Sequence, residues 1–435
     1  MNNSLNQLMT LLIAFSTISI NAAETKLSLA VQKKAEARQF IEKKEYLKAG
    51  QSFREAVQLG LSYEYGQWKA VDSYIKAKAL GQALQIMSEL AENGDTQIDY
   101  YKYLSEYFTG ENNKQFIEIM AKVKLNTQDH NNEILSHKGV ESHIYTQDVD
   151  HFFKAFDQAK NMNNIQEKKA AYEINYFDKA SIGMVDYISM KVNSIDDFVD
   201  HIENNRAYYE DVRLATKKIK KLIPDALKAM GKMKDYYPQA TSSNIYFIVG
   251  MHTSAGTASS NGILIGADFI SSSKQNTENL NEWTLPFITA AEDKVWVIVH
   301  EYVHTLQNTN TENILGNALV EGGADFLANL LYATPKQPKK YTSFGLANEC
   351  RIKYKFIKQI DTNDLNLWTG NNGEELPKNW VPDLGYFIGH QISQAYYQQA
   401  KDKTQAIKDL LELKSPKTIL SKSGYMNLDN PVDCR

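Results

Sequence analysis

The 435-residue sequence predicts an α+β fold that is mostly α. Three observations predict it. Residues 27–125 read as amphipathic helices with a recurring pattern, and runs of β-forming residues at 245–249 and 263–265 predict a small antiparallel sheet. A strongly apolar helical run also surrounds His300 and His304. A chain of this length suits two domains better than one.

The chain begins with a short apolar segment at 8–20, followed by small residues at 21–23. This segment is well short of the ~20 residues that span a bilayer, and small residues follow it as a signal peptidase requires. We therefore expect residues 1–23 to be a signal peptide that directs the protein to the periplasm or the medium. Because no Lys or Arg precedes the segment, an uncleaved tail is the alternative. No later apolar run has membrane length, so we expect no transmembrane segment.

Residues 24–125 form the predicted helical domain. A shift of 34 residues aligns similar residues, namely Phe40 with Tyr74, Ile41 with Ile75, Lys44 with Lys78, Tyr46 with Leu80, Ala49 with Ala83 and Phe53 with Met87. This is the tetratricopeptide period, so we expect two helix pairs with breaks near 43–45 and 77–79, and a degenerate third that includes Phe108. A helical bundle without repeat geometry is the alternative. Repeats of this kind offer a surface to a protein partner.

A polar, Asn-rich segment at 126–140 is the expected linker to a second domain at 141–435. Within that domain, 141–235 looks mainly helical, with a helix start at 194–198. The net charge of −4 offers no basic stripe, so we expect no nucleic-acid partner.

Two apolar runs precede the two histidines. Residues 245–249 and 263–265 flank a stretch rich in Gly, Ser, Thr and Ala at 253–262. The pattern predicts a hairpin in which the two runs pair and the stretch between them is the turn.

His300 and His304 belong to an H-E-x-x-H pattern within an apolar run. Residues four apart on a helix share a face, so both imidazoles can reach one ion, and a capping box at 289–292 predicts a helix over 290–307. Two His ligands, a third protein ligand and an open position form a catalytic zinc site, with Glu301 placed as general base. We expect one zinc ion per chain. Other first-row ions also fit, and a buried helix without metal is the alternative.

The third ligand is predicted to be Glu321. On a second helix, Asp325 lies one turn later, where its carboxylate can orient a liganding histidine. Two glycines in a helix are costly, so Gly322 and Gly323 indicate that this helix passes close to a neighbour. Solvated helix charges are the alternative reading of both carboxylates.

With these motifs the chain resembles the thermolysin-like gluzincins, whose pattern is H-E-x-x-H followed by a helix with E-x-x-x-D. More narrowly, it resembles a bacterial family of predicted zinc-dependent proteases related to a gliding-motility lipoprotein group. The resemblance covers about residues 140–425, and the matching pieces are 148–153, 245–250, 256–257, 262–266, the zinc helix with Gln307, 321–326 and 383–389. It implies a peptidase fold with one catalytic zinc and a peptide or protein substrate. In such folds an antiparallel edge strand before the zinc helix binds extended substrate, although an ordinary internal strand fits these residues equally well.

Tyr386 and His390 lie one helical turn apart, and either could stabilise the oxyanion that develops during hydrolysis. Tyr386 is preferred because it falls in the Gly-Tyr pattern of the resembled family. An aromatic and a polar residue on a packed helix is the alternative. No Gly-Ala-Met-Glu-Asn pattern is present, which favours an endopeptidase over an aminopeptidase.

Two cysteines, Cys350 and Cys434, are compatible with one disulfide in an exported protein, while two free thiols fit nearly as well. The predicted function is an exported zinc metallopeptidase. The alternative is a non-catalytic scaffold that binds partners through its repeats and keeps a structural zinc site. Glu301 argues against that alternative, because a structural site needs no base.

Overall fold

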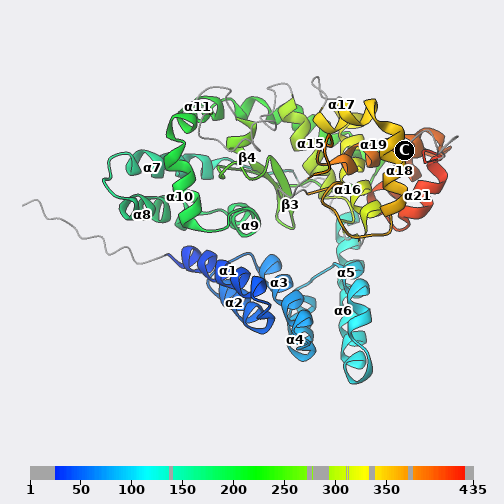
Figure 1. Ribbon diagram of the computed structural model, residues 1–435, viewed down its shortest axis with the longest axis horizontal. Coiled ribbons are helices and arrows are strands. Elements are labelled where there is room, and N and C mark those ends of the chain that lie inside the picture. The colour runs from blue at the N-terminus through cyan, green and yellow to red at the C-terminus, as the bar shows by residue number, and fades with distance from the viewer. Residues whose placement is uncertain are drawn as a thin grey trace, which may run out of the picture.

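The computed structural model describes residues 25–136, 141–271, 277, 293–309, 311, 313–332, 339–370 and 376–426. This part of the chain is mostly helical and holds a four-stranded sheet, which confirms the predicted α+β, mostly α class (Figure 1). The predicted signal peptide at 1–23 lies outside these residues. None of the described helices is long and apolar enough to cross a membrane.

Six helices form the N-terminal region, which lies below the rest of the molecule in Figure 1. They are α1 (Lys26–Glu42), α2 (Tyr46–Gln58), α3 (Tyr63–Lys76), α4 (Leu80–Glu92), α5 (Ile98–Leu104) and α6 (Asn113–Ser136), with short 3-10 turns at Ser105–Tyr107 and Gly110–Asn112. The breaks between α1 and α2 and between α3 and α4 fall at 43–45 and 77–79, the positions expected from the sequence. The backbone repeats as well: Lys44 and Lys78 have φ of 59° and 57°, and Gly60 and Gly94 have φ of 107° and 89°.

These helices enclose an apolar core of their own, separate from the main core of the molecule. Phe53 and Met87, which the 34-residue shift aligns, are both buried in it, and Phe108 is buried in it as well. The expected linker at 126–140 is largely helical, because α6 continues through it to Ser136. Two of its polar residues, Asn126 and Thr127, form hydrogen bonds to the end of α4 and the segment after it.

Asn126 on α6 donates to the backbone oxygens of Ala91 and Asp95, and the hydroxyl of Thr127 donates to that of Thr96. These bonds hold α6 to the end of α4 and to the segment that follows it. Asn126 and Thr127, at the start of the expected linker, therefore help to pack two helices together.

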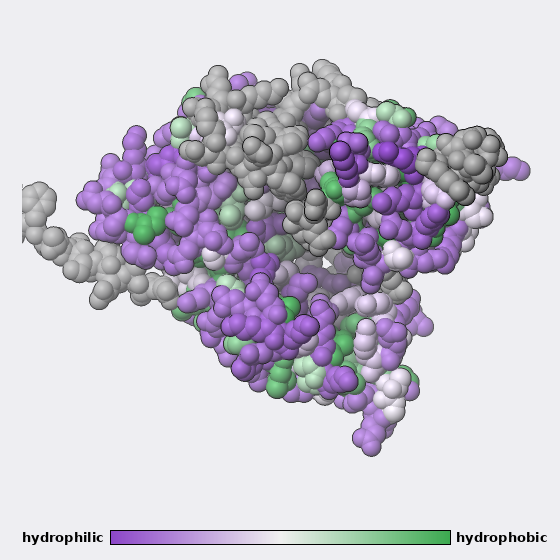
Figure 2. All heavy atoms as spheres, viewed as in Figure 1, coloured by the Kyte–Doolittle hydropathy of each residue, from purple (hydrophilic) through white to green (hydrophobic). Residues whose placement is uncertain are grey.

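Lys34 on α1 joins the N-terminal region to the body. Its side chain is fully buried, and the ammonium donates to the carbonyls of Ile188, Ser189 and Val192 at the C-terminal end of α9 (Ile182–Lys191). Burial lowers the pKa of Lys34 to about 7, while three carbonyls at the negative end of a helix favour the charged form. Figure 2 shows the surface hollowed between the N-terminal helices and the body above them.

The body contains the remaining elements, listed here in chain order: β1 (Ile144–Tyr145), α7 (Gln147–Ala159), α8 (Ile165–Asn175), α10 (Ile195–Asn204), α11 (Arg206–Thr216), α12 (Ile223–Gly231), α13 (Met233–Tyr236), β2 (Ile245–Ile248), β3 (Gly256–Ser259), β4 (Gly262–Gly266), α14 (Ala267–Ile270), α15 (Lys294–His304), α16 (Ile314–Leu331), α17 (Lys340–Ala347), α18 (Glu349–Gln359), α19 (Leu384–Gln399), α20 (Lys403–Glu412) and α21 (Pro416–Ser423). Two 3-10 turns lie at Phe177–Lys179 and Ile219–Lys221. The predicted helix start at 194–198 is confirmed, because the Ser194 side chain caps α10 by accepting from the Asp197 amide.

The sheet corrects the predicted hairpin. Its strand order is β1-β2-β4-β3, and β2 pairs with β4 in parallel, whereas the sequence predicted an antiparallel pair. The expected turn contains an extra strand, β3, which pairs antiparallel with β4 around a tight turn at 260–261. The small residues of β3 gave no β-forming signal, which is why the strand was missed. β3 is an edge strand of this sheet, and β2 is internal.

Helix α15 packs against β3 and β4, α16 packs against α15, and α19 packs against α16 (Figure 1). The predicted close approach of α16 is real, but its partner at Gly322 is α19. A Cβ added to Gly322 would lie 2.2 Å from the backbone nitrogen of His390, and one added to Gly389 would lie 1.6 Å from the backbone oxygen of Ala318. Glycine at these two positions lets the backbones of α16 and α19 touch.

Candidate metal centre

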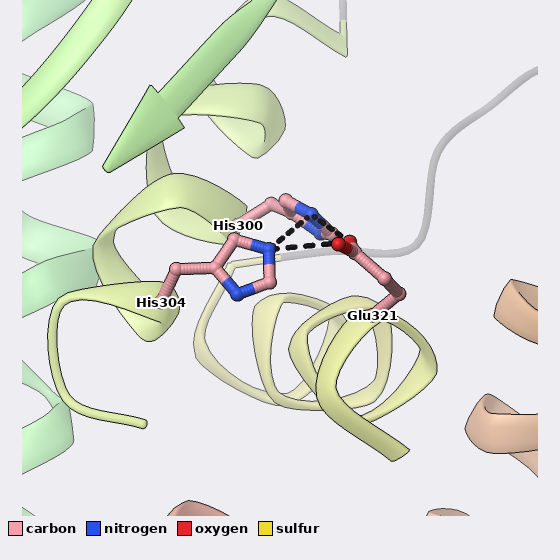
Figure 3. Close-up of side chains that lie close together, drawn as sticks. All are labelled: His300, His304 and Glu321. Carbon is pink, nitrogen blue, oxygen red and sulfur yellow. Dashed lines mark hydrogen bonds and ion pairs between the residues drawn. The ribbon is translucent and has the colours of Figure 1, made fainter. Parts of the chain in front are cut away.

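The metal centre is built on α15 and α16. α15 begins at Lys294 and ends at His304, which is shorter than the predicted 290–307, and the predicted capping box at 289–292 lies outside the described residues. His300 and His304 project from successive turns of α15, and Glu321 reaches them from α16 (Figure 3). His300 is 7% exposed and the Glu321 side chain 27%, so the site is mostly buried.

The three candidate ligand atoms have the spacing of a metal site. Nε2 of His304 lies 3.1 Å from Nε2 of His300 and 3.3 Å from Oε2 of Glu321, and Nε2 of His300 lies 3.7 Å from the same oxygen. Bonds of 2.0–2.2 Å in a tetrahedral site put neighbouring ligand atoms about 3.3–3.6 Å apart. The group therefore fits a metal ion with one coordination position left for water or substrate.

The far nitrogen of His300 faces Asp325, one turn beyond Glu321 on α16. Oδ1 of Asp325 lies 2.9 Å from Nδ1 of His300, and the hydroxyl of Tyr341 donates to Oδ2 over 2.7 Å. A carboxylate in this position fixes the tautomer and the ring orientation of a liganding histidine. Tyr341, on α17, was not singled out from the sequence. It holds the Asp325 carboxylate in turn.

The far nitrogen of His304 faces Gln307. Nδ1 of His304 lies 2.8 Å from Oε1 of Gln307, whose amide nitrogen donates to the Val320 carbonyl over 3.0 Å. Both histidines thus have an oxygen at Nδ1 and leave Nε2 for a metal. In the sequence, Gln307 stands out only through the family resemblance. Its spacing of three residues from His304 could also have indicated that the two side chains meet.

The site is strongly polarised when no metal occupies it. Burial alone would lower the pKa of His300, but Asp325 and Glu321 raise it to about 10. Burial alone would raise the pKa of the Glu321 carboxyl, but the two histidines hold this pKa well below its ordinary value. The protein thus surrounds this centre with negative charge that a proton or a cation neutralises.

Glu301 follows His300 on α15 and faces strand β3. A Cβ added to Gly256 would lie 2.4 Å from Cγ and 2.7 Å from Oε1 of Glu301, so the first residue of β3 lies directly against this side chain. Glu301 is 8% exposed. Strand β3, at the edge of the sheet, therefore lies directly beside Glu301, the candidate general base.

Tyr386 and His390 lie on α19 but differ in surroundings. The ring of Tyr386 stacks on that of His300 with centroids 6.3 Å apart, and burial together with the nearby Glu321 and Asp383 carboxylates raises the pKa of its hydroxyl, which stays protonated. His390 is engaged elsewhere. The Asn329 amide oxygen accepts from the Trp296 indole, so the amide nitrogen faces Nε2 of His390 at 3.0 Å. Tyr386 thus packs on a candidate ligand, whereas the His390 ring nitrogen faces Asn329.

Of the predicted cysteine pair, Cys350 lies on α18 and Cys434 falls outside the described residues. Their disulfide stays a prediction. Comparison of the chain with protein-family models, with curated proteins and with solved structures found no match.

Proposed function

We propose that the protein is a zinc-dependent metallopeptidase. The observation that carries the proposal is the placement of His300, His304 and Glu321 at metal-ligand spacing with Glu301 beside them. Zinc is preferred because two imidazoles, one carboxylate and an open position form its usual catalytic ligand set. The resemblance to gluzincins, with H-E-x-x-H followed by E-x-x-x-D, supports the same choice.

When bound, the ion would polarise the scissile carbonyl and make a water molecule more acidic. Glu301 accepts the proton of the attacking water and passes it to the leaving amine. The hydroxyl of Tyr386 donates to the carbonyl oxygen as negative charge develops on it, which is expected to lower the barrier by a few kcal/mol. Asp325 keeps His300 in the tautomer that presents Nε2.

The finer parts of the proposal concern substrate and place. We propose a peptide or protein substrate, cleaved internally because no motif for an amino terminus is present. The 34-residue recurrence of helix breaks and left-handed turns supports tetratricopeptide-like repeats, and these offer a protein-binding surface. The apolar N-terminal segment supports export to the periplasm or beyond.

The alternative is a scaffold in which the metal is structural. Glu301→Gln separates the two, because the substitution keeps the size of the side chain and removes its basicity. We expect the variant to retain one zinc per chain by elemental analysis and to lose at least about 100-fold in digestion of a peptide library, a typical size for a general base. His300→Ala is the matched control and should lose the metal. A wild-type protein that binds zinc but cleaves no peptide would favour the scaffold.

A further inference from the structure

Gln307 lies three residues after His304, just beyond the end of α15, and both ends of its amide are used. The oxygen faces Nδ1 of His304 at 2.8 Å, and the nitrogen donates to the Val320 carbonyl on α16 over 3.0 Å. Val320 directly precedes Glu321. One side chain thus connects two of the candidate metal ligands, which lie on different helices.

The Val320 carbonyl determines which way the amide points. A backbone carbonyl can only accept a hydrogen bond, so the amide nitrogen must face it and the amide oxygen must face His304. An amide oxygen also can only accept, so His304 must carry its proton on Nδ1. The lone pair of Nε2 is then directed toward His300 and Glu321, where a metal would lie.

We propose that Gln307 is a positioning residue that transmits the orientation of the α16 backbone to the tautomer of His304. It does not touch the metal. The inference rests on the metal site of the proposed function, and it is independent of whether that site hydrolyses peptides. Loss of a partner that orients a liganding histidine weakens metal binding by roughly 10 to 100-fold.

The test compares three variants of the full chain by zinc titration against a chromophoric chelator. Gln307→Met keeps the size of the side chain and removes both hydrogen bonds, and we expect it to weaken zinc binding by roughly 10 to 100-fold. Gln307→Glu keeps an acceptor for His304 and loses the donor for Val320, so it should restore most of the affinity lost in Gln307→Met. Gln359→Leu removes a comparable amide on α18, whose oxygen accepts from the Trp368 indole and not from a candidate ligand, and should leave the affinity unchanged.

A nitrogen-15 histidine spectrum of the zinc-loaded proteins gives the second readout. The wild type should show His304 protonated on Nδ1 and bound through Nε2, and Gln307→Met should show an altered or mixed signal. Equal zinc affinity in Gln307→Met and the wild type, or failure of Gln307→Glu to recover any affinity, would overturn the role of Gln307. A wild type that binds no zinc would overturn the metal site as well, which distinguishes the two failures.

Discussion

The N-terminal helices contain glycines with open surroundings, whereas the described glycines of the metal centre are closely packed. In the N-terminal region, Gly60 and Gly94 end helices with left-handed φ and Gly81 within α4 has open space where a Cβ would be, although Gly50 and Gly66 lie against the Tyr74 and Val57 side chains. At the metal centre, Gly256 and Gly389 are pressed against other atoms. The first region depends on local turn geometry that recurs along the chain, and the second depends on close approach between segments far apart in sequence.

Gly389→Ala should change the protein more than Asp325→Ala, Tyr341→Phe or Gly81→Ala. Its new methyl group would lie 1.6 Å from the Ala318 carbonyl oxygen, so α16 and α19 would have to separate. Overpacking of this kind costs about 3 kcal/mol or more, because backbone atoms cannot move aside as a side chain can. Chemical denaturation monitored by circular dichroism would measure the loss of stability. A cost below about 1 kcal/mol would show that the two helices adjust easily.

Asp325→Ala tests the metal centre without changing its packing so severely. The carboxylate orients His300 and is itself held by Tyr341, so its removal frees the imidazole to rotate. We expect zinc affinity to fall by roughly 10 to 100-fold while the fold survives. Tyr341→Phe, which removes only the outer hydrogen bond, should cost about fivefold. An unchanged affinity in Asp325→Ala would also weaken the case for Glu321, which was assigned to the same helix face.

The contrast also explains what the sequence could predict. His300, Glu301 and His304 were found because helix geometry alone brings residues four apart to one face. Glu321 and Asp325 followed from the same rule on a second helix. Tyr341 was not found, because it reaches Asp325 from a third helix and no local pattern connects them.

The sheet shows the same limit. The runs that became β2 and β4 do pair, as the sequence predicted, but in parallel, because β3 is the strand that forms an antiparallel hairpin with β4. The small residues at 256–259 form no run of β-formers, so no local pattern indicated β3. Small residues let the edge strand lie against Glu301. The same small residues give no β-forming signal in the sequence.

The pH dependence of metal binding provides a third test, with an effect of about tenfold per pH unit. His300 has an ordinary pKa of 6.5 that the neighbouring carboxylates raise to about 10, so the metal-free protein carries a proton there at neutral pH. Zinc must displace it, and the affinity should therefore fall as the pH is lowered. In the metal-free protein the same group stabilises the fold fully below pH 6.5, and this stabilisation is lost as the pH rises toward about 10.

Calorimetric titration with zinc in two buffers of different ionisation enthalpy would count the protons released near pH 7. Release of at least about one proton per zinc is expected. In Asp325→Ala the number should decrease, since the carboxylate that raises the pKa of His300 is gone. Binding without proton release in the wild type would contradict the charge distribution described for the centre.

Gly81→Ala is the smallest change and the counterpart of Gly389→Ala. Gly81 lies in the first turn of α4, has an ordinary negative φ, and has no atom within 4 Å of the position that a Cβ would take. Alanine loses less backbone entropy on folding than glycine, so the variant should be more stable by about 0.5–1 kcal/mol. The same substitution therefore changes sign between the two positions. A loss of stability in Gly81→Ala would mean that α4 has a close neighbour on this face, and the contrast between Gly81 and Gly389 would fail.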